Sequence, residues 1–201
     1  MTIYIIRHGQ TVWNLENRKQ GHSDSPLTLK GIEQAGNVCD ILKQENLDYQ
    51  KCHIFVSPLF RTKQYAQIIL ENLKINKKLI NEEHLIKEHG FGAWEGMTQD
   101  EVDKFFPGET EKRMQDRWNY IIPGGGESYE IISKRAEQFL KKFNFNNDKN
   151  IILICHEMVS KMLRYNLLNL SKKEALDLNH PQDTIYRYCN EGLASLKNSK
   201  D

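Results

Sequence analysis

Three short apolar segments, each followed by a helical pattern, constrain the fold of this chain most strongly. They are residues 3–6 (IYII), 53–56 (HIFV) and 151–154 (IILI). Short, continuous apolar runs are typical of strands that are buried on both faces of a sheet, and strands that alternate with helices form βαβ units. The sequence therefore predicts an α/β fold with a mostly parallel central sheet flanked by helices on both faces.

Helix-start signals support this alternation of strands and helices. Expected caps are Thr28, then Ser57 with proline at the first helical position, and Thr98 with Glu101 as a capping box for a short helix up to Phe106. Two longer helices are expected at 132–143 and 159–167, and two late strands at 184–188 and 193–196. With no repeat, linker or low-complexity segment in 201 residues, we expect one domain over residues 1–201.

Charge and cysteine usage exclude several classes of protein. The net charge is +1, from 28 basic and 27 acidic residues, so no global field favours nucleic acid or an anionic membrane. No run of 18 apolar residues and no targeting segment is present, and we expect a cytoplasmic protein. The four widely spaced cysteines are expected to be reduced thiols, mainly in the core.

Cationic and imidazole side chains stand where the apolar segments end. Arg7 and His8 follow the first segment, Arg61 lies one helical turn after the second, and His156 follows the third. Ligands of open α/β sheets bind at the carboxyl ends of the strands, where helix N-termini also present N–H groups. Because planar guanidinium groups bind oxyanions in bidentate fashion, the sequence predicts a phosphate site at this edge.

Two histidines in one phosphate site indicate phosphoryl transfer as well as binding. One neutral imidazole can attack phosphorus, while a second, protonated imidazole holds the phosphoryl oxygens. His8 is the better nucleophile because the turn at Gly9 can bring a backbone group to one ring nitrogen and fix the tautomer. The leaving alkoxide then needs a proton, which Glu88 or Glu95 could supply from a carboxyl group whose pKa is raised by burial.

Five blocks of the sequence occur in the order of a known family. They are RHGQTVWN at 7–14, SPLFRTKQYA at 57–66, KEHGFGAWEG at 87–96, GGES at 125–128 and a strand ending in His156. Together they resemble the histidine phosphatase superfamily, the phosphoglycerate mutase-like group, from residue 3 to about residue 165. The resemblance implies one three-layer domain with a mostly parallel sheet and no metal.

This resemblance also implies roles for individual residues. His8 would be the phosphorylated nucleophile, with Arg7, Arg61 and His156 around the phosphoryl group, and Glu88 would be the proton donor and then the base for water. The substrate side of the site would comprise Gly9, Gln10, Thr11, Asn14, Gln20 and Gly21. One position departs from the family, because Glu157 replaces the glycine that usually follows the second histidine. Since a carboxylate would repel phosphate, we expect Glu157 to point away from the pocket.

Three functions remain open at this point. The leading hypothesis is hydrolysis of the phosphomonoester of a small phosphorylated metabolite; a phosphoglycerate mutase would use the same site, and a non-catalytic phospholigand-binding protein would keep only the fold. Only 68 positions separate Glu88 from His156, which favours a phosphatase, because related mutases usually carry a longer excursion there. No cofactor is expected, except 2,3-bisphosphoglycerate for a mutase.

Metal and second-anion sites have weaker signals. The segment HEMVS at 156–160 lacks the second histidine of a zinc H-E-x-x-H motif. Arg113 and Arg117 are more typical of a helix surface than of a second anion site, although both interpretations stay open. Trp13 and Trp94 either wall the substrate entrance or pack in the core.

Overall fold

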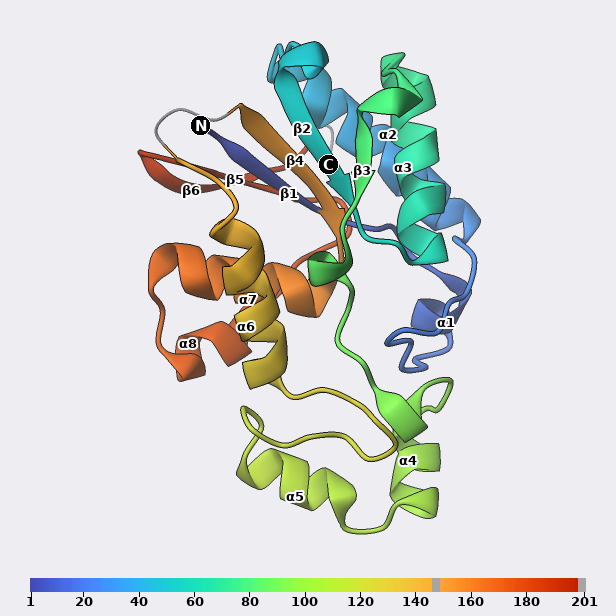
Figure 1. The fold of residues 1–201 in the computed structure, drawn as a ribbon. Coiled ribbons are helices and arrows are strands. Elements are labelled where there is room, and N and C mark those ends of the chain that lie inside the picture. The colour runs from blue at the N-terminus through green and yellow to red at the C-terminus, as the bar shows by residue number, and fades with distance from the viewer. Residues whose placement is uncertain (146–148, 199–201) are drawn as a thin grey trace.

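A six-stranded mixed sheet forms the centre of the protein (Figure 1). The computed structural model describes residues 1–145 and 149–198. In the order β3-β2-β4-β1-β5-β6, the sheet has four parallel strands, β3 to β1, and two antiparallel strands at one edge. The strands are β1 (Ile3–Arg7), β2 (Cys52–Val56), β3 (Ile80–Glu82), β4 (Asn150–Cys155), β5 (Ile185–Cys189) and β6 (Gly192–Leu196). The predicted fold class is confirmed; β3 was not expected, because its sequence INE has no apolar run.

Helices cover both faces of the sheet. The α-helices are α1 (Val12–Leu15), α2 (Leu29–Gln44), α3 (Phe60–Leu73), α4 (Gln99–Phe105), α5 (Glu109–Gln115), α6 (Tyr129–Leu140), α7 (Glu157–Leu168) and α8 (Lys172–Asp177). The 3₁₀ turns are η1 (Tyr49–Lys51), η2 (Lys77–Leu79), η3 (His84–Ile86) and η4 (Gly92–Trp94). Helices α2 and α3 pack on one face, and α6 and α7 pack on the other (Figure 1).

Two hydrophobic cores lie on opposite faces of the sheet. In β1, Tyr4 and Ile6 point into the core shared with α2 and α3, whereas Ile3 and Ile5 point into the core shared with α6 and α7. Successive side chains of a strand point to opposite faces, so a strand buried on both sides must be apolar throughout. This explains the continuous apolar runs in the sequence.

The start of α3 differs from the prediction. The helix begins at Phe60, and Ser57 still belongs to the strand end, where its N–H donates to the Ile154 carbonyl at 3.0 Å. The Asp24 carboxylate instead accepts from the N–H groups of Phe60, at 2.7 Å, and Arg61, at 3.2 Å. A distant carboxylate therefore performs the capping that Ser57 was expected to perform.

Other helix ends follow the sequence more closely. Thr28 caps α2, Thr98 forms the expected capping box of α4, and Ser128 caps α6. The helix expected up to Phe143 ends at Leu140, and the Phe143 ring packs against Phe55 with 5.6 Å between ring centroids. Within the described residues, no helix is long and apolar enough to cross a membrane. All four cysteines are free thiols, and only Cys189 is not fully buried.

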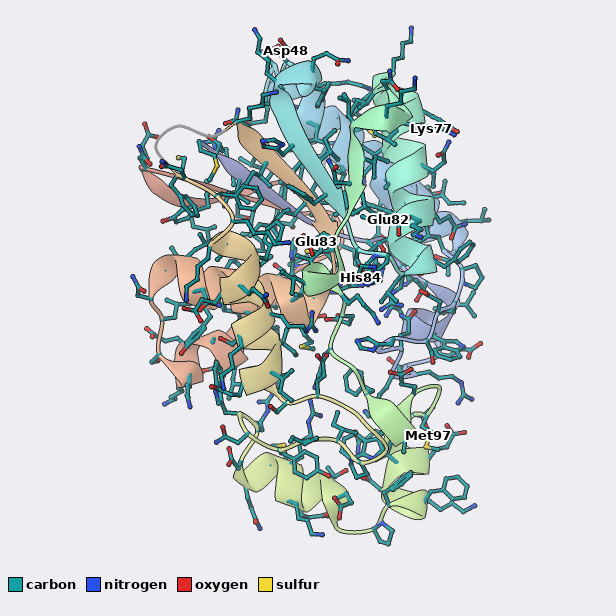
Figure 2. The ribbon with its side chains drawn as sticks, viewed as in Figure 1. Asp48, Lys77, Glu82, Glu83, His84 and Met97 are labelled. Carbon is teal, nitrogen blue, oxygen red and sulfur yellow. The ribbon has the colours of Figure 1, made fainter. Side chains whose placement is uncertain are left out.

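The carboxyl ends of the parallel strands face the smaller segment that carries α4 and α5. Figure 2 shows Asp48 and Lys77, which precede β2 and β3, at the end of the molecule opposite to Met97. Glu82, Glu83 and His84 lie between them, where the chain leaves β3 (Figure 2). The chain then continues to Glu88, so this region is where the predicted site residues converge.

Candidate active site

A small polar pocket of about 150 Å³ lies at the carboxyl ends of β1 and β4. Four of the five predicted catalytic residues line it, and the fifth, His156, lies beside His8. The lining residues are Arg7, His8, Asn14, Arg18, Lys19, Gln20, Gly21, Arg61, Glu88, Phe91, Glu157 and Met158.

His8 is held in one orientation and one tautomer. Its backbone N–H continues the β1–β4 ladder by donating to the Cys155 carbonyl at 3.1 Å. Arg61 Nε, which can only donate, lies 3.2 Å from His8 Nε2, so Nε2 is the acceptor and Nδ1 carries the proton. Nδ1 donates to the Gly9 carbonyl at 2.7 Å, which agrees with the predicted role of this turn. Burial, then Arg61 and Arg7, holds the pKa of His8 well below its usual range, so the ring is neutral.

His156 lies next to His8 at the start of α7. The two ring centroids are 5.1 Å apart, and His156 Nε2 is 2.7 Å from the Ser57 hydroxyl oxygen. Nδ1 is buried and has no partner among the described residues. Burial and the charge of Arg61 hold the pKa of His156 well below its usual range. The charge of a phosphoryl group would favour the protonated ring, so the protonated imidazole stays a prediction for the phosphate-bound site.

Arg61 is the most completely buried cation of the site. Its Nη1 donates to the Ser23 carbonyl at 2.8 Å and to Asp24 at 2.6 Å, and its Nη2 donates to the Gly21 carbonyl at 2.8 Å. The ion pair with Asp24 compensates for burying the guanidinium, which is only 1% exposed. Asp24 thus caps α3 and orients Arg61, two roles that sequence reasoning missed.

Arg7 is shared between the backbone and Glu157. Its Nη1 donates to the His180 carbonyl at 2.7 Å and pairs with Glu157 Oε2 at 2.9 Å, while Nε is buried without a partner among the described residues. Glu157 also lines the pocket. The expectation that it points away is wrong, because Arg7 attracts its carboxylate into the site and Lys161 holds the other oxygen at 3.6 Å.

The Glu88 carboxyl group lies against the N-terminus of α7. Oε1 accepts from the N–H of its neighbour His89 at 2.9 Å and from Met158 N–H at 3.2 Å. Burial raises the pKa of Glu88 and outweighs these hydrogen bonds and the charge of Arg61, all of which favour the carboxylate. A buried carboxyl group with a raised pKa beside a phosphate pocket has the properties of a proton donor.

Arg135 fixes the loop that carries Glu88. Its guanidinium donates to the carbonyls of Leu85, Lys87 and Glu88 at 2.8–3.2 Å and to both oxygens of Glu127 at 2.9 Å. Burial would raise the pKa of Glu127, but His22, Arg135 and the Gly90 N–H together lower it to about 2. Sequence reasoning did not identify Arg135, because nothing in the α6 pattern distinguishes it from a solvated helix residue.

Glu95, the second candidate donor, has a different position. Its carboxylate accepts from the N–H groups of His22, Ser23 and Phe91 and from the Ser23 hydroxyl. These bonds lower the pKa of Glu95 despite its burial. An ionised, fully bonded carboxylate cannot donate a proton, so Glu95 organises the 21–23 loop and Glu88 remains the candidate donor.

The six predicted substrate residues divide into two groups. Asn14, Gln20 and Gly21 line the pocket. Gly21 has φ +58°, and a Cβ there would lie 2.2 Å from Glu95 Oε1, so only glycine fits. The Asn14 side-chain oxygen accepts from Gln182 at 3.0 Å, which ties this wall to the loop before β5.

Gly9, Gln10 and Thr11 are not among the residues that line the pocket. The Gln10 side-chain oxygen accepts from the Thr28 hydroxyl at 2.9 Å, at the start of α2. Thr11 caps α1 and accepts from Gln20 at 2.7 Å. A Cβ on Gly9 would lie 2.4 Å from the Gly31 carbonyl oxygen. These three residues therefore do not line the pocket, and they hold the segments around it through contacts with α1, Gln20 and the start of α2.

The aromatic and cationic residues outside the pocket also have definite positions. Trp94 is 1% exposed and packs with Val102 and Ile122, which places it in a small core of the α4 segment. The Arg113 guanidinium lies 5.9 Å from the Phe91 ring and 5.8 Å from the Trp94 ring, and neither Arg113 nor Arg117 lines the pocket. Among the described residues, no group of three or more His, Cys, Asp or Glu side chains could hold a metal ion.

Comparison with known proteins gives a consistent set of similarities. The family model of the histidine phosphatase superfamily (branch 1) matches residues 3–192. The adenosylcobalamin/alpha-ribazole phosphatase of Escherichia coli is 28% identical over 176 residues, covering 85% of this chain and 80% of that protein. Phosphoglycerate mutase-like protein 4 of Arabidopsis thaliana is 30% identical over 162 residues, covering 80% of this chain and 68% of that protein.

Solved structures show the same fold. The alpha-ribazole phosphatase of Shigella flexneri superimposes with a TM-score of 0.81 at 24% identity, covering 99% of this chain and 96% of that one. A mycobacterial glucosyl-3-phosphoglycerate phosphatase has a TM-score of 0.76 at 21% identity, covering 97% and 96% of the two chains.

Proposed function

Because this chain belongs to the histidine phosphatase superfamily (branch 1), we propose that it hydrolyses phosphomonoesters through a phosphohistidine on His8. The observation that supports this most directly is the fixed tautomer of His8. Its proton is directed to the Gly9 carbonyl, so the Nε2 lone pair faces a pocket that also presents Arg7, Arg61 and Glu88. A neutral imidazole with this orientation is a nucleophile ready for an in-line attack.

In the first step, His8 Nε2 forms a bond to phosphorus as the ester P–O bond breaks. The Arg61 N–H that points at Nε2 then donates a hydrogen bond to a phosphoryl oxygen, and Arg7 and His156 also bind the phosphoryl group. Glu88 transfers its proton to the departing alkoxide, a contribution of about 10²- to 10⁴-fold in rate. In the second step, Glu88 takes a proton from water, which attacks the phosphohistidine and releases inorganic phosphate.

Of the four similar proteins described above, three are named phosphatases and one is named a phosphoglycerate mutase-like protein, which favours the phosphatase. The relative from Escherichia coli is named a phosphatase, and two of the similar structures are those of phosphatases that act on small phosphorylated compounds, according to their names. A small phosphorylated metabolite is therefore the proposed substrate class. A mutase would use the same residues and return the phosphoryl group to an alcohol, with 2,3-bisphosphoglycerate as its cofactor; the phosphatase is proposed to need none. The cytoplasmic location stays a prediction.

The test is hydrolysis of 4-nitrophenyl phosphate by the wild-type protein, His8→Ala and His84→Ala. His84 is a matched control, because it lies where the chain leaves β3 and does not line the pocket (Figure 2). We expect His8→Ala to lose at least about 10³-fold in kcat/KM and His84→Ala to keep wild-type activity. Full activity in His8→Ala would refute the mechanism, and a wild-type protein that binds phosphate without turnover would identify a binding protein.

The mutase alternative has its own assay. With 3-phosphoglycerate, the phosphatase releases inorganic phosphate, whereas a mutase forms 2-phosphoglycerate and is stimulated by 2,3-bisphosphoglycerate. Isomer formation faster than phosphate release would establish the mutase.

A further inference from the structure

Glu157 places a negative charge inside a pocket that binds negatively charged groups. Its Oε2 lies 2.9 Å from Arg7 Nη1, and its Oε1 lies 3.6 Å from Lys161 Nζ. The Lys161 side chain is only 8% exposed, and Glu157 is its one ion-pair partner among the described residues. With a cation on each oxygen, the carboxylate is held in the pocket and does not swing into solvent.

The position of Glu157 also fixes which part of a substrate it meets. Glu157 is the first residue of α7, and Glu88 binds the N–H of the next residue, Met158. Arg7 is a proposed ligand of the phosphoryl group, and Glu88 is the proposed donor to the ester oxygen. The Glu157 carboxylate thus lies between Arg7 and the α7 N-terminus that holds Glu88, on the side of the pocket where the ester oxygen and its carbon would lie.

We propose that Glu157 determines specificity, by disfavouring esters with an anionic group on the ester-bearing carbon and favouring those of uncharged, hydroxyl-bearing alcohols. This inference rests on the proposed phosphatase function and names its substrate class. A carboxylate repels a second anion at short range, whereas it accepts hydrogen bonds from hydroxyl groups. The pocket volume of about 150 Å³ and the polar walls from Asn14 and Gln20 suit a small polyol or sugar phosphate.

Other charges on the pocket wall are the same in the wild type and in a variant of Glu157. Arg18 is bound to Glu16 at 3.0 Å and to Glu101 at 2.7 Å, so its charge is compensated. Lys19 donates to the neutral Gln99 amide at 2.8 Å and therefore still attracts anions. Because a variant of Glu157 leaves Lys19 in place, comparing the variant with the wild type isolates the contribution of Glu157.

The experiment uses two esters that differ in one group. Glycerol 2-phosphate and 2-phosphoglycerate have the same phosphate on the same secondary carbon, but one carries a hydroxymethyl group where the other carries a carboxylate. We expect the wild-type protein to have a higher kcat/KM for glycerol 2-phosphate. In Glu157→Gln the preference should fall about tenfold, by removal of one partly solvated charge interaction. Changes at the phosphoryl group itself affect both esters and cancel in the ratio.

The matched control is Glu45→Gln, which removes an equal charge from an ion pair with Arg187, 3.0 Å long, away from the pocket. It should leave the ratio unchanged. A wild-type preference for 2-phosphoglycerate overturns the proposal even if Glu157→Gln does not fold, and so does an unchanged ratio in a folded, active Glu157→Gln. A wild-type protein that hydrolyses neither these esters nor 4-nitrophenyl phosphate overturns the proposed function itself.

Discussion

Replacing Asp24 by alanine should weaken both the stability and the activity of the protein, because one carboxylate caps α3 and anchors Arg61. Asp24 accepts from two backbone N–H groups at the start of α3 and pairs with the Arg61 guanidinium at 2.6 Å. Losing a helix cap costs about 1 kcal/mol. Losing a hydrogen bond to a charged, buried partner costs about 1.5–3 kcal/mol, and the lower part of this range applies because the Asp24 side chain is 23% exposed.

The expected loss is therefore about 3 kcal/mol in the free energy of unfolding. For a chain of 201 residues this lowers Tm by about 6–12 °C. Thermal unfolding followed by circular dichroism measures this change. In parallel, kcat/KM for 4-nitrophenyl phosphate should fall about 100-fold, because displacing a group that positions the phosphoryl group by about 1 Å has an effect of this order.

Asp48→Ala is the matched control for this prediction. Asp48 also caps a helical turn, accepting from Gln50 N–H at 3.1 Å, but it is exposed and lies at the end of the molecule opposite to Met97 (Figure 2). We expect a loss below about 1 kcal/mol and unchanged kcat/KM. Equal Tm losses in the two variants, with kcat/KM of Asp24→Ala within twofold of the wild type, would show that the carbonyls of Ser23 and Gly21 alone hold Arg61.

Three further predictions follow from the site. Glu88→Gln should lose about 10²- to 10⁴-fold in kcat for alkyl phosphates but much less for 4-nitrophenyl phosphate, whose leaving group needs no proton, and equal losses would count against Glu88 as the donor. In the wild type, kcat for alkyl phosphates should decline as pH rises through the raised pKa of Glu88. Because Arg135 holds the backbone of Glu88, Arg135→Met should change the pH at which kcat declines, and Arg135→Lys should restore part of the wild-type profile. The free energy of unfolding should fall as pH drops below about 6.5, because the unfolded chain takes up protons that four buried histidines cannot accept: His89 and His180, with pKa values lowered to about 4 and about 3, and His8 and His156, with pKa values well below the usual range. Between pH 7.5 and 5.5, His89 and His180 alone account for a loss of about 3 kcal/mol in urea unfolding, and His8 and His156 add to it. Equal stability at the two pH values would contradict the neutral state of these histidines.

The main features of the site could be predicted because they depend on local patterns. A short apolar run followed by a helical pattern is enough to predict a strand and the helix after it. Parallel strands bring their carboxyl ends to the same edge of the sheet. Arg7 is the last residue of β1, and His8 and His156 directly follow β1 and β4, so their convergence follows from topology. Arg61 lies one helical turn further on, within reach of the same edge.

The features that could not be predicted depend on contacts between distant segments. Asp24 reaches α3 across 36 positions, and Arg135 binds the Glu88 carbonyl across 47. No spacing rule connects such pairs. Glu157 was placed wrongly for the same reason, since its orientation depends on Arg7, which precedes it by most of the chain. The polar strand β3 forms because its backbone pairs with the N–H and C=O groups at the edge of β2. This pairing does not depend on the side chains of β3, so its sequence does not predict it.

The position of β1 in the sheet has a consequence for biosynthesis. This strand emerges from the ribosome before both of its neighbours in the sheet, β4 and β5, which begin at residues 150 and 185. At about 5–20 residues per second, the segment IYII waits on the order of 7–30 s for its first strand partner. During this interval an apolar strand with two open edges is available to chaperones and to other nascent chains. Slowing translation between residues 60 and 150 should therefore lower the yield of native protein more than slowing it after residue 190.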